Sequence, residues 1–207
     1  MSEPDRSRRP NRREIAAAAT REEVLRAARR LFAANGYAPT TLNQIAEEAG
    51  VAIQTVYSSV GGKPALVLAL NDLIDAESGV GPLAAEIART DDAEVVFVNS
   101  VKLTRQLNER CSDILRVLLA AAPSNPDVAA AVRDGMARHR GGAELFGHRL
   151  AELDALGPGV SAEQATTAYA VMTSPDNWRQ LTQDFGWSYD KAEAWLVDSL
   201  TRLLRRP

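Results

Sequence analysis

The segment Thr40–Lys63 constrains the fold of this chain most strongly, because it has the pattern of two short helices joined by a glycine turn. Thr41 and Gln44 have the spacing of a capping box, which predicts a helix that begins directly after Thr41. Gly50 can adopt the left-handed conformation that ends such a helix. A second helix is predicted over residues 52–60.

This second helix has two unlike faces. Projected at about 100° per residue, three apolar side chains fall within about 60° of one another and three polar side chains lie opposite them. These are Ile53, Val56 and Val60 against Gln54, Thr55 and Ser58. A helix this short is unstable alone, so its apolar edge must pack on neighbouring helices. The polar face then remains for an external partner, as in a helix-turn-helix whose second helix enters the DNA major groove.

The residues around this motif resemble the N-terminal domain of the TetR family of transcriptional regulators, over about Thr20 to Leu73. Three positions depart from the family: Ala52 stands where Ser is common, Ser59 where His is common, and Val60 where Phe is frequent. The first departure removes a helix cap, and the second removes a phosphate-binding side chain. The matching positions are Leu31, Phe32, Gly36, Tyr37, Thr41, Ile45, Ala46, Ala49, Gly50, Val51, Thr55, Tyr57, Lys63 and Leu66.

The resemblance implies a ligand-responsive transcriptional repressor that binds double-stranded DNA. In this reading Thr41 and Lys63 bind phosphates at helix N-termini, and Gln54 can pair bidentately with adenine. Tyr57 either reaches a phosphate or only packs on the helix, and Ile53 meets either a thymine methyl group or the core. The full set of expected DNA contacts is Thr41, Ile53, Gln54, Thr55, Tyr57, Ser58, Ser59 and Lys63.

The charge distribution supports this expectation. Residues 1–63 hold ten basic and seven acidic side chains, a net charge of +3, whereas the rest of the chain holds 14 basic and 20 acidic side chains, a net charge of −6. A basic N-terminal third on an acidic body is typical of a modular DNA-binding protein. Residues 1–13 are expected to form a disordered basic arm, which is either a solvated tail or a phosphate contact. Its arginines are Arg6, Arg8, Arg9, Arg12 and Arg13.

Other function classes lack support. The lone Cys111 cannot form an internal disulfide, and His139 and His148 are the only histidines, so no metal site or cofactor is expected. No nucleophile–base pair or carboxylate pair indicates catalysis. The chain has no apolar run long enough for a membrane span and no secretory signal pattern, so a cytoplasmic location is expected. The alternative is an all-α small-molecule-binding or enzymatic protein without DNA binding.

The whole chain is expected to be all-α, with about nine to ten helices: a three-helix helix-turn-helix domain followed by a helical bundle. The first helix begins between Asn11 and Thr20, and Gly62 and Pro64 flank the start of a fourth helix. Gly141 and Gly142 predict a kink or a close helix contact rather than a break. The expected domains are residues 14–73 for DNA binding and 74–207 for ligand binding and dimerisation. The expected body helices are 92–107, 109–121, 126–155, 162–173, 175–185 and 189–205.

The C-terminal helices resemble those that pair into a four-helix bundle between TetR-family subunits. Aromatic anchors are enriched at such contacts, and a two-fold symmetric dimer can read two half-sites of a palindromic operator. We therefore expect a homodimer, the alternative being a core-facing final helix in a monomer. The expected interface residues are Trp178, Trp195, Leu196, Leu200 and Leu203.

In this family the body helices enclose a ligand cavity, so an unidentified small-molecule effector is expected, most simply an apolar one. The candidate residues are the larger or semi-polar side chains of the middle helices, for which ordinary core packing is the alternative. They are Phe97, Met136, His139, Phe146, Tyr169 and Met172.

Overall fold

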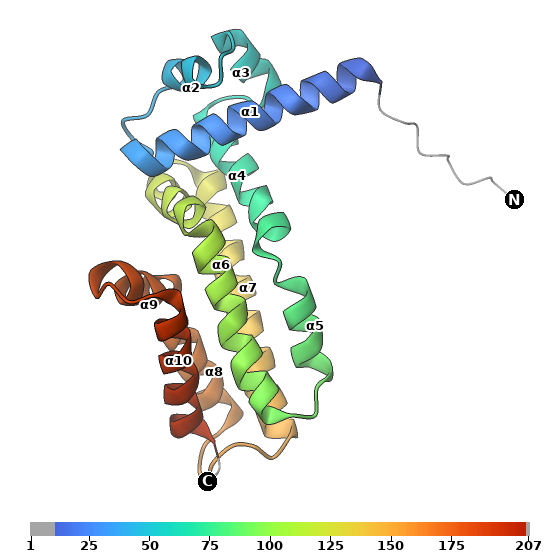
Figure 1. Cartoon of the computed structure of the whole chain (residues 1–207), viewed down its shortest axis with the longest axis vertical. Helices are drawn as coiled ribbons and strands as arrows, with labels where there is room; N and C mark the ends of the chain where they lie inside the picture. Colours follow the sequence, from blue (N-terminus) through green and yellow to red (C-terminus); the bar gives the residue numbers. More distant parts are fainter. Residues whose placement is uncertain (1–10, 206–207) are drawn as a thin grey trace, which may run out of the picture.

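The computed structural model describes residues 11–205 and is built from α-helices, as the sequence predicts (Figure 1). Helices α1 to α3 form a compact unit at one end, and α4 runs from that unit into the body. The bounds are α1 Arg12–Asn35, α2 Leu42–Glu48, α3 Ile53–Ser59, α4 Lys63–Ser78, α5 Gly81–Arg89, α6 Ala93–Ala121, α7 Pro126–Glu152, α8 Ala162–Met172, α9 Pro175–Arg179 and α10 Tyr189–Leu204. A 3₁₀ turn, Ala122–Ser124, joins α6 to α7, and a π-helical turn, Gln180–Asp184, follows α9.

Helix α1 begins at the earliest position of the predicted range, directly after Asn11. The Asn11 side chain accepts a hydrogen bond from the Glu14 amide, and the Glu14 carboxylate accepts one from the Asn11 amide, which forms a complete capping box. Thr20 lies inside the helix, where its hydroxyl donates to the Ala16 carbonyl. The predicted disordered arm is therefore too long at its C-terminal end, because Arg12 already begins α1. Residues 1–10 of that arm lie outside the described part of the chain.

The body differs from expectation at two helices. The predicted helices 92–107 and 109–121 are one continuous helix, α6. Asn108, at the predicted break, is buried, and its side chain donates to the Thr104 carbonyl one turn earlier. Helix α5 was not predicted, although Pro82 in its first turn is a helix-start signal.

Close helix packing in α7 occurs at a glycine other than the predicted ones. Helix α7 continues through Gly141 and Gly142, and a side chain added at either position would meet no atom within 4 Å. Gly147 is the residue that faces α8. A Cβ atom there would lie 2.3 Å from the Thr166 hydroxyl and 2.4 Å from the Ala162 carbonyl oxygen. The two helix backbones therefore approach each other at Gly147.

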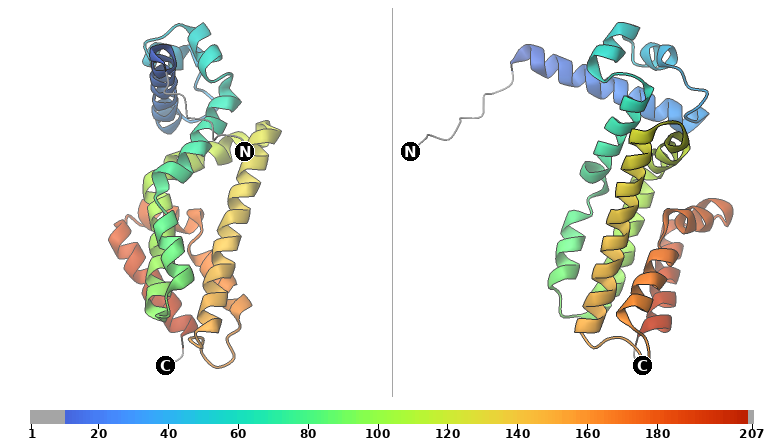
Figure 2. Two further views of the ribbon diagram at one scale, coloured as in Figure 1. Left: turned by 90° about the vertical axis from the view of Figure 1, so that its right-hand side faces the viewer. Right: turned by 180° about the vertical axis from the view of Figure 1, so that it is seen from behind.

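Two hydrophobic cores hold the molecule together. The first joins α1–α4 to the C-terminal half of α6, where Cys111, Ile114 and Leu118 pack with the N-terminal helices. The second fills the body between α6, α7, α8 and α10, whose arrangement Figure 2 shows from two further sides. Because α4 and the first core both extend past residue 73, the predicted domain boundary falls inside a shared, packed region. No helix in residues 11–205 is long and apolar enough to cross a membrane.

Candidate nucleic-acid interface

The turn between α2 and α3 has the geometry that the sequence predicts. The Thr41 hydroxyl accepts from the Gln44 amide, and the Gln44 side chain accepts from the Thr41 amide, so the capping box is complete. Gly50 has φ +66°, the left-handed conformation that allows the chain to turn. The Val51 amide then donates to the Ala46 carbonyl and closes the turn.

Helix α3 is anchored along one edge and open along the other. Val56 is fully buried, and Ile53 and Val60 are half-buried against the same core. On the other side Gln54 is exposed, and the side chain of Tyr57 is 56% exposed. The predicted division into an apolar edge and a polar face is thus present in the structure. Ser58 is exposed and Thr55 and Ser59 are half-buried.

The two ends of α3 are held differently. Ala52 is the N-cap residue and makes no side-chain capping bond. At the other end the guanidinium of Arg21, in α1, donates to the Ser59 carbonyl at 2.9 Å. An arginine at a helix C-terminus donates to a carbonyl that has no partner within the helix. Its positive charge also interacts favourably with the negative end of the helix dipole. Sequence reasoning missed Arg21, because nothing local links it to a helix 38 residues away.

Lys63 begins α4 beside the helix-turn-helix. Its ammonium donates to the Ala38 carbonyl at 3.0 Å and lies 4.3 Å from the centre of the Tyr37 ring. Burial lowers the pKa of the Lys63 ammonium. An ammonium group has three N–H donors, so one bond to Ala38 leaves the others for a phosphate.

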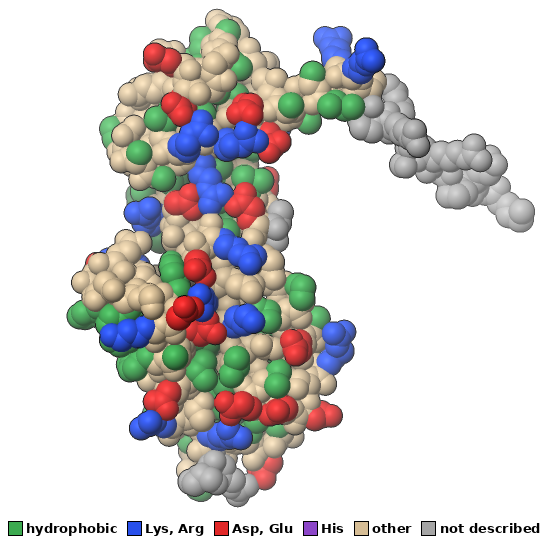
Figure 3. Space-filling view, in the orientation of Figure 1, with side chains coloured by type: hydrophobic (Ala, Val, Ile, Leu, Met, Phe, Trp, Pro, Cys, Tyr) green, Lys and Arg blue, Asp and Glu red, His purple; other side chains and the backbone are tan. Residues whose placement is uncertain are grey.

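Basic side chains also occur at the free end of α1. Arg12 and Arg13 are exposed, and Figure 3 shows Lys and Arg side chains at this projecting end of the helix. Basic and acidic side chains lie side by side where α1 crosses the body.

Residues 24–70, which contain α2, α3 and most of the first core, match the family model described as bacterial regulatory proteins, tetR family. This segment is a TetR-family N-terminal domain. Members of this family are transcriptional regulators rather than enzymes, in agreement with the expected DNA-binding function and the expected lack of catalysis. A search of curated proteins found no match.

Solved structures of TetR-family and related regulators share the fold over nearly the full chain. A putative transcriptional regulator from Saccharomonospora viridis in complex with choline is 20% identical, with a TM-score of 0.73, over 92% of this chain and 100% of that one. NalD of Pseudomonas aeruginosa, the secondary repressor of a multidrug efflux pump, is 22% identical, with a TM-score of 0.68, over 92% and 98%. The complex of Stenotrophomonas maltophilia SmeT with triclosan is 20% identical, with a TM-score of 0.64, over 91% and 92%.

Four of the predicted ligand residues form one aromatic row, and three of them, Phe97, Phe146 and Tyr169, belong to the second core. Phe97 and Phe146 meet edge to face at 5.4 Å, Phe146 stacks on Tyr169 at 4.6 Å, and His139 lies beyond Tyr169 at 6.5 Å between ring centres. The Tyr169 hydroxyl donates to the Ser100 carbonyl at 2.8 Å, and burial raises its pKa, which keeps the phenol protonated.

The other two ligand candidates differ from this row. Met172 is half-buried at the end of α8 and packs on the second core. Met136 is 52% exposed on α7, so its side chain does not join the aromatic row. The hydroxyl of Ser100, which was not predicted, is buried in the second core region without a hydrogen-bond partner.

The predicted dimer residues also separate into two groups. Trp178 is 1% exposed and its indole N–H donates to the Thr104 hydroxyl, so it belongs to the core of its own chain. Leu196 and Leu200 are likewise fully buried. Trp195 and Leu203 are 45% and 58% exposed on the other side of α10. Trp187, which is half-buried and packs edge to face on Trp195, was not predicted, nor were the exposed side chains of Val171 and Phe185.

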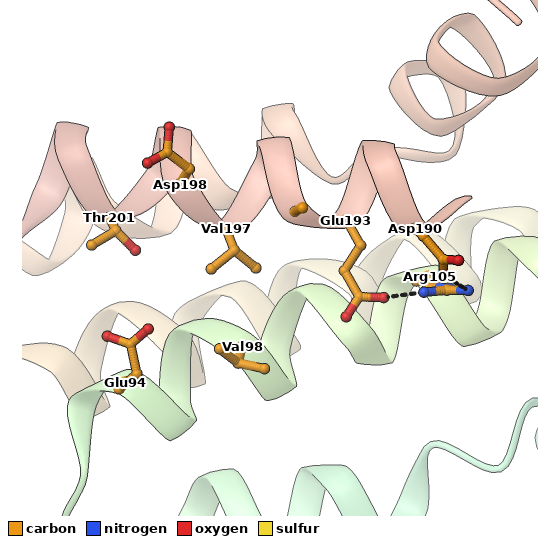
Figure 4. A pocket seen from close by; sticks show the side chains of 9 residues that line it. Glu94, Val98, Arg105, Asp190, Glu193, Val197, Asp198 and Thr201 are labelled. Atoms are coloured by element: carbon orange, nitrogen blue, oxygen red, sulfur yellow. Dashed lines mark hydrogen bonds and ion pairs between the residues drawn. The ribbon is translucent and has the colours of Figure 1, made fainter. Parts of the chain in front are cut away.

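A surface groove of about 580 Å³ runs between α6 and α10 (Figure 4). Val98 and Val197 form its apolar floor, and carboxylates line its edges. Each of these carboxylates already has a partner on the protein: Arg105 binds Asp190 and Glu193, Arg205 binds Glu94, and Arg202 binds Asp198. The groove contains none of the predicted ligand residues, and its Arg105 and Arg205 ion pairs fasten the C-terminal segment to α6.

Proposed function

We propose that this chain is a cytoplasmic, dimeric repressor whose helix α3 reads a palindromic operator and whose body binds a small-molecule effector. The observation that carries this proposal is the exposed polar face of α3, because Val56 anchors the opposite edge and leaves Gln54 and Tyr57 in solvent. A short helix with such a face fits the major groove. The proposed contacts are Gln54, Thr55 and Ser58 with base edges, Ile53 with a thymine methyl group at the rim, and Thr41, Tyr57, Ser59 and Lys63 with phosphates.

Dimer formation follows from the exposed apolar side chains of α8 and α10. Trp195, Leu203 and Val171 expose large apolar surfaces on the two helices. Covering such surfaces is favourable, and aromatic side chains are enriched in interfaces. In the proposed dimer, residues 74–207 provide this contact and residues 14–73 provide DNA binding, although the two regions share a core.

The proposed effector binds near the aromatic row of the second core. Phe97, Phe146 and Tyr169 offer aromatic faces, and Ser100 offers an unpaired buried hydroxyl. This environment suits a largely apolar molecule with one hydrogen-bonding group. The ligands named for two related structures, triclosan and choline, are also small molecules. The effector acts by favouring a dimer geometry that fits DNA poorly.

The decisive experiment selects bound sequences from a random pool of duplex DNA. We expect a palindrome whose half-sites are about one helical turn or a multiple of it apart. Affinity for the selected duplex should fall steeply between about 50 and 200 mM salt, because phosphate contacts release counterions. If the protein retained no duplex at about 50 mM salt, the DNA-binding proposal would be wrong, and the small-molecule-binding alternative would be favoured.

A further inference from the structure

Arg29 joins three helices at the boundary between the DNA-binding end and the body. It lies in α1, and its guanidinium binds the Asp113 carboxylate of α6 through two hydrogen bonds of 2.5 and 2.9 Å. A third bond of 2.6 Å reaches Glu77 in the last turn of α4, and a fourth of 2.8 Å reaches the Arg110 carbonyl. Only guanidinium geometry allows this set of bonds from one side chain.

Electrostatics show that this junction is held as charged pairs. Burial acts to raise the pKa of the Asp113 carboxyl, but its bonds with Arg29 and with the backbone amides of Asp113 and Ile114 together outweigh burial, and the pKa is lowered from its ordinary value. Hydrogen bonding to Asp113 likewise raises the pKa of Arg29. Both side chains are about one-quarter exposed, so solvent weakens the interaction less than it weakens a fully exposed pair.

The same junction also holds the C-terminal end of α4. The Arg110 guanidinium donates to the carbonyls of Glu77 and Ser78 at 3.2 and 3.1 Å. Gly79 then ends the helix with φ +65°, and a Cβ atom there would lie 2.7 Å from Arg110. Helix α6 therefore binds both the end of α4 and the middle of α1.

Helix α1 carries a second arginine contact, to the DNA-reading helix. Arg21 donates to the Ser59 carbonyl at the C-terminal end of α3. Arg21 and Arg29 are about 12 Å apart along one uninterrupted helix, at 1.5 Å per residue. Two rigidly connected side chains thus hold α3 at one point and the body at another.

We propose that α1 is a rigid connection between the body and the recognition helix, with Arg29 as its contact to α6 and Arg21 as its contact to α3. A displacement of α6 moves Asp113, Arg29 and α1, and α1 then moves the C-terminal end of α3 through Arg21. This path runs in parallel with the covalent path through α4. The position of α3 depends strongly on the path through α1, because the N-terminal end of α3 has no side-chain cap. The proposal deepens the proposed function, and its regulatory meaning rests on that function.

The first test measures hydrogen exchange of α3 amides in the DNA-free protein. We expect Asp113→Asn, a change in the body, to speed exchange across Ile53–Ser59 by about tenfold, within the usual range of coupling energies. Arg29→Gln should have the same effect. The matched control is Arg26→Gln, which removes the same charge from the same helix but breaks only pairs with Glu22 and Glu23 inside α1.

The second test measures affinity for the duplex recovered by selection. Arg29→Gln and Arg21→Gln should each weaken binding by about tenfold, and the double variant should be little worse than either one, because both break the same path. The salt dependence for Arg29→Gln should stay that of the wild type, since Arg29 is not proposed to touch a phosphate.

The outcomes separate this proposal from the proposed function. Unchanged α3 exchange in both Asp113→Asn and Arg29→Gln would overturn the connection, whatever the protein binds. Changed exchange in a protein that binds no duplex would keep the connection and overturn the DNA-binding function. If Arg29→Gln does not fold, Arg29→Lys keeps the charge but not the paired geometry and gives the same comparison.

Discussion

Residues of the same amino-acid type have different roles in this protein, depending on how each side chain is packed. Trp178 is a core residue bound to Thr104, whereas Trp195, 17 positions later, is 45% exposed on the outer side of α10. Arg29 and Arg26 are three residues apart in α1, yet one joins three helices and the other pairs only within its own helix. These differences arise from tertiary packing, so the sequence alone did not distinguish them.

A first prediction at this scale separates base reading from phosphate binding. Gln54→Ala should relax base preference at one operator position by about 1–3 kcal/mol, because the amide can pair with one base. Lys63→Ala should weaken all sequences and lower the salt slope by about one. Binding titrations over a set of single-base operator variants and salt concentrations measure both effects. Equal loss on every operator for Gln54→Ala would exclude it from base reading.

A second prediction concerns the missing cap of α3. Ala52 has the extended backbone of an N-cap residue but no side-chain acceptor. Ala52→Ser should therefore stabilise the folded protein by about 0.5–2 kcal/mol, the usual value of a hydroxyl cap. Urea unfolding gives the free-energy difference, with Ala52→Val as a control that lacks a cap acceptor. An equal effect of both substitutions would contradict the capping explanation.

At the scale of helices, local signals predicted most of the elements. Capping residues such as Thr41, Ser161 and Asn125 act on amides within a few positions, so the starts of α2, α8 and α7 could be found from the sequence. The continuity of α6 could not be found in this way, because Thr104, Asn108 and Cys111 in its middle are buried by neighbouring helices, which is a tertiary effect. The recognition helix was predictable from the spacing of Ile53, Val56 and Val60, which is also a local signal. The Arg21 contact that holds it was not predictable, because it joins residues far apart in the sequence.

A prediction at this scale contrasts two glycines of α7. Gly147→Ala should destabilise the protein by about 1–3 kcal/mol, because the new methyl group would overlap the backbone and a side chain of α8. Gly141→Ala should stabilise it by about 1 kcal/mol, because it gains helix propensity and meets no neighbour. Thermal and urea unfolding measure both changes. The same sign for the two variants would contradict the assigned close approach.

At the scale of the whole molecule, the two cores and the exposed faces have distinct roles. The first core joins the DNA-binding helices to α6, and the second core joins α6 to α7, α8 and α10. Helix α6 takes part in both, which is why the body and the DNA-binding end are not separated by a flexible linker. The remaining exposed apolar side chains of α8 and α10 are the part of the surface that a second subunit is proposed to cover.

The corresponding prediction tests the dimer. The double substitution Trp195→Glu with Leu203→Glu should convert the dimer to monomers, because charges on both positions oppose burial in an interface. Sedimentation velocity measures the change in mass, and duplex binding should weaken along with it because the paired half-sites are lost. Leu119→Glu, at an exposed apolar position of α6, is the control and should leave the mass unchanged. A double variant that remained dimeric would place the interface elsewhere.

The close approach at Gly147 has a mechanical consequence for how the body can make room for an effector. Where two backbones already touch, the helices cannot come closer to each other. Helices α7 and α8 therefore act as one stiff wall of the body. We expect an incoming molecule to make room by displacing α6 rather than by separating α7 from α8, and Asp113, which binds Arg29, lies in the far half of α6.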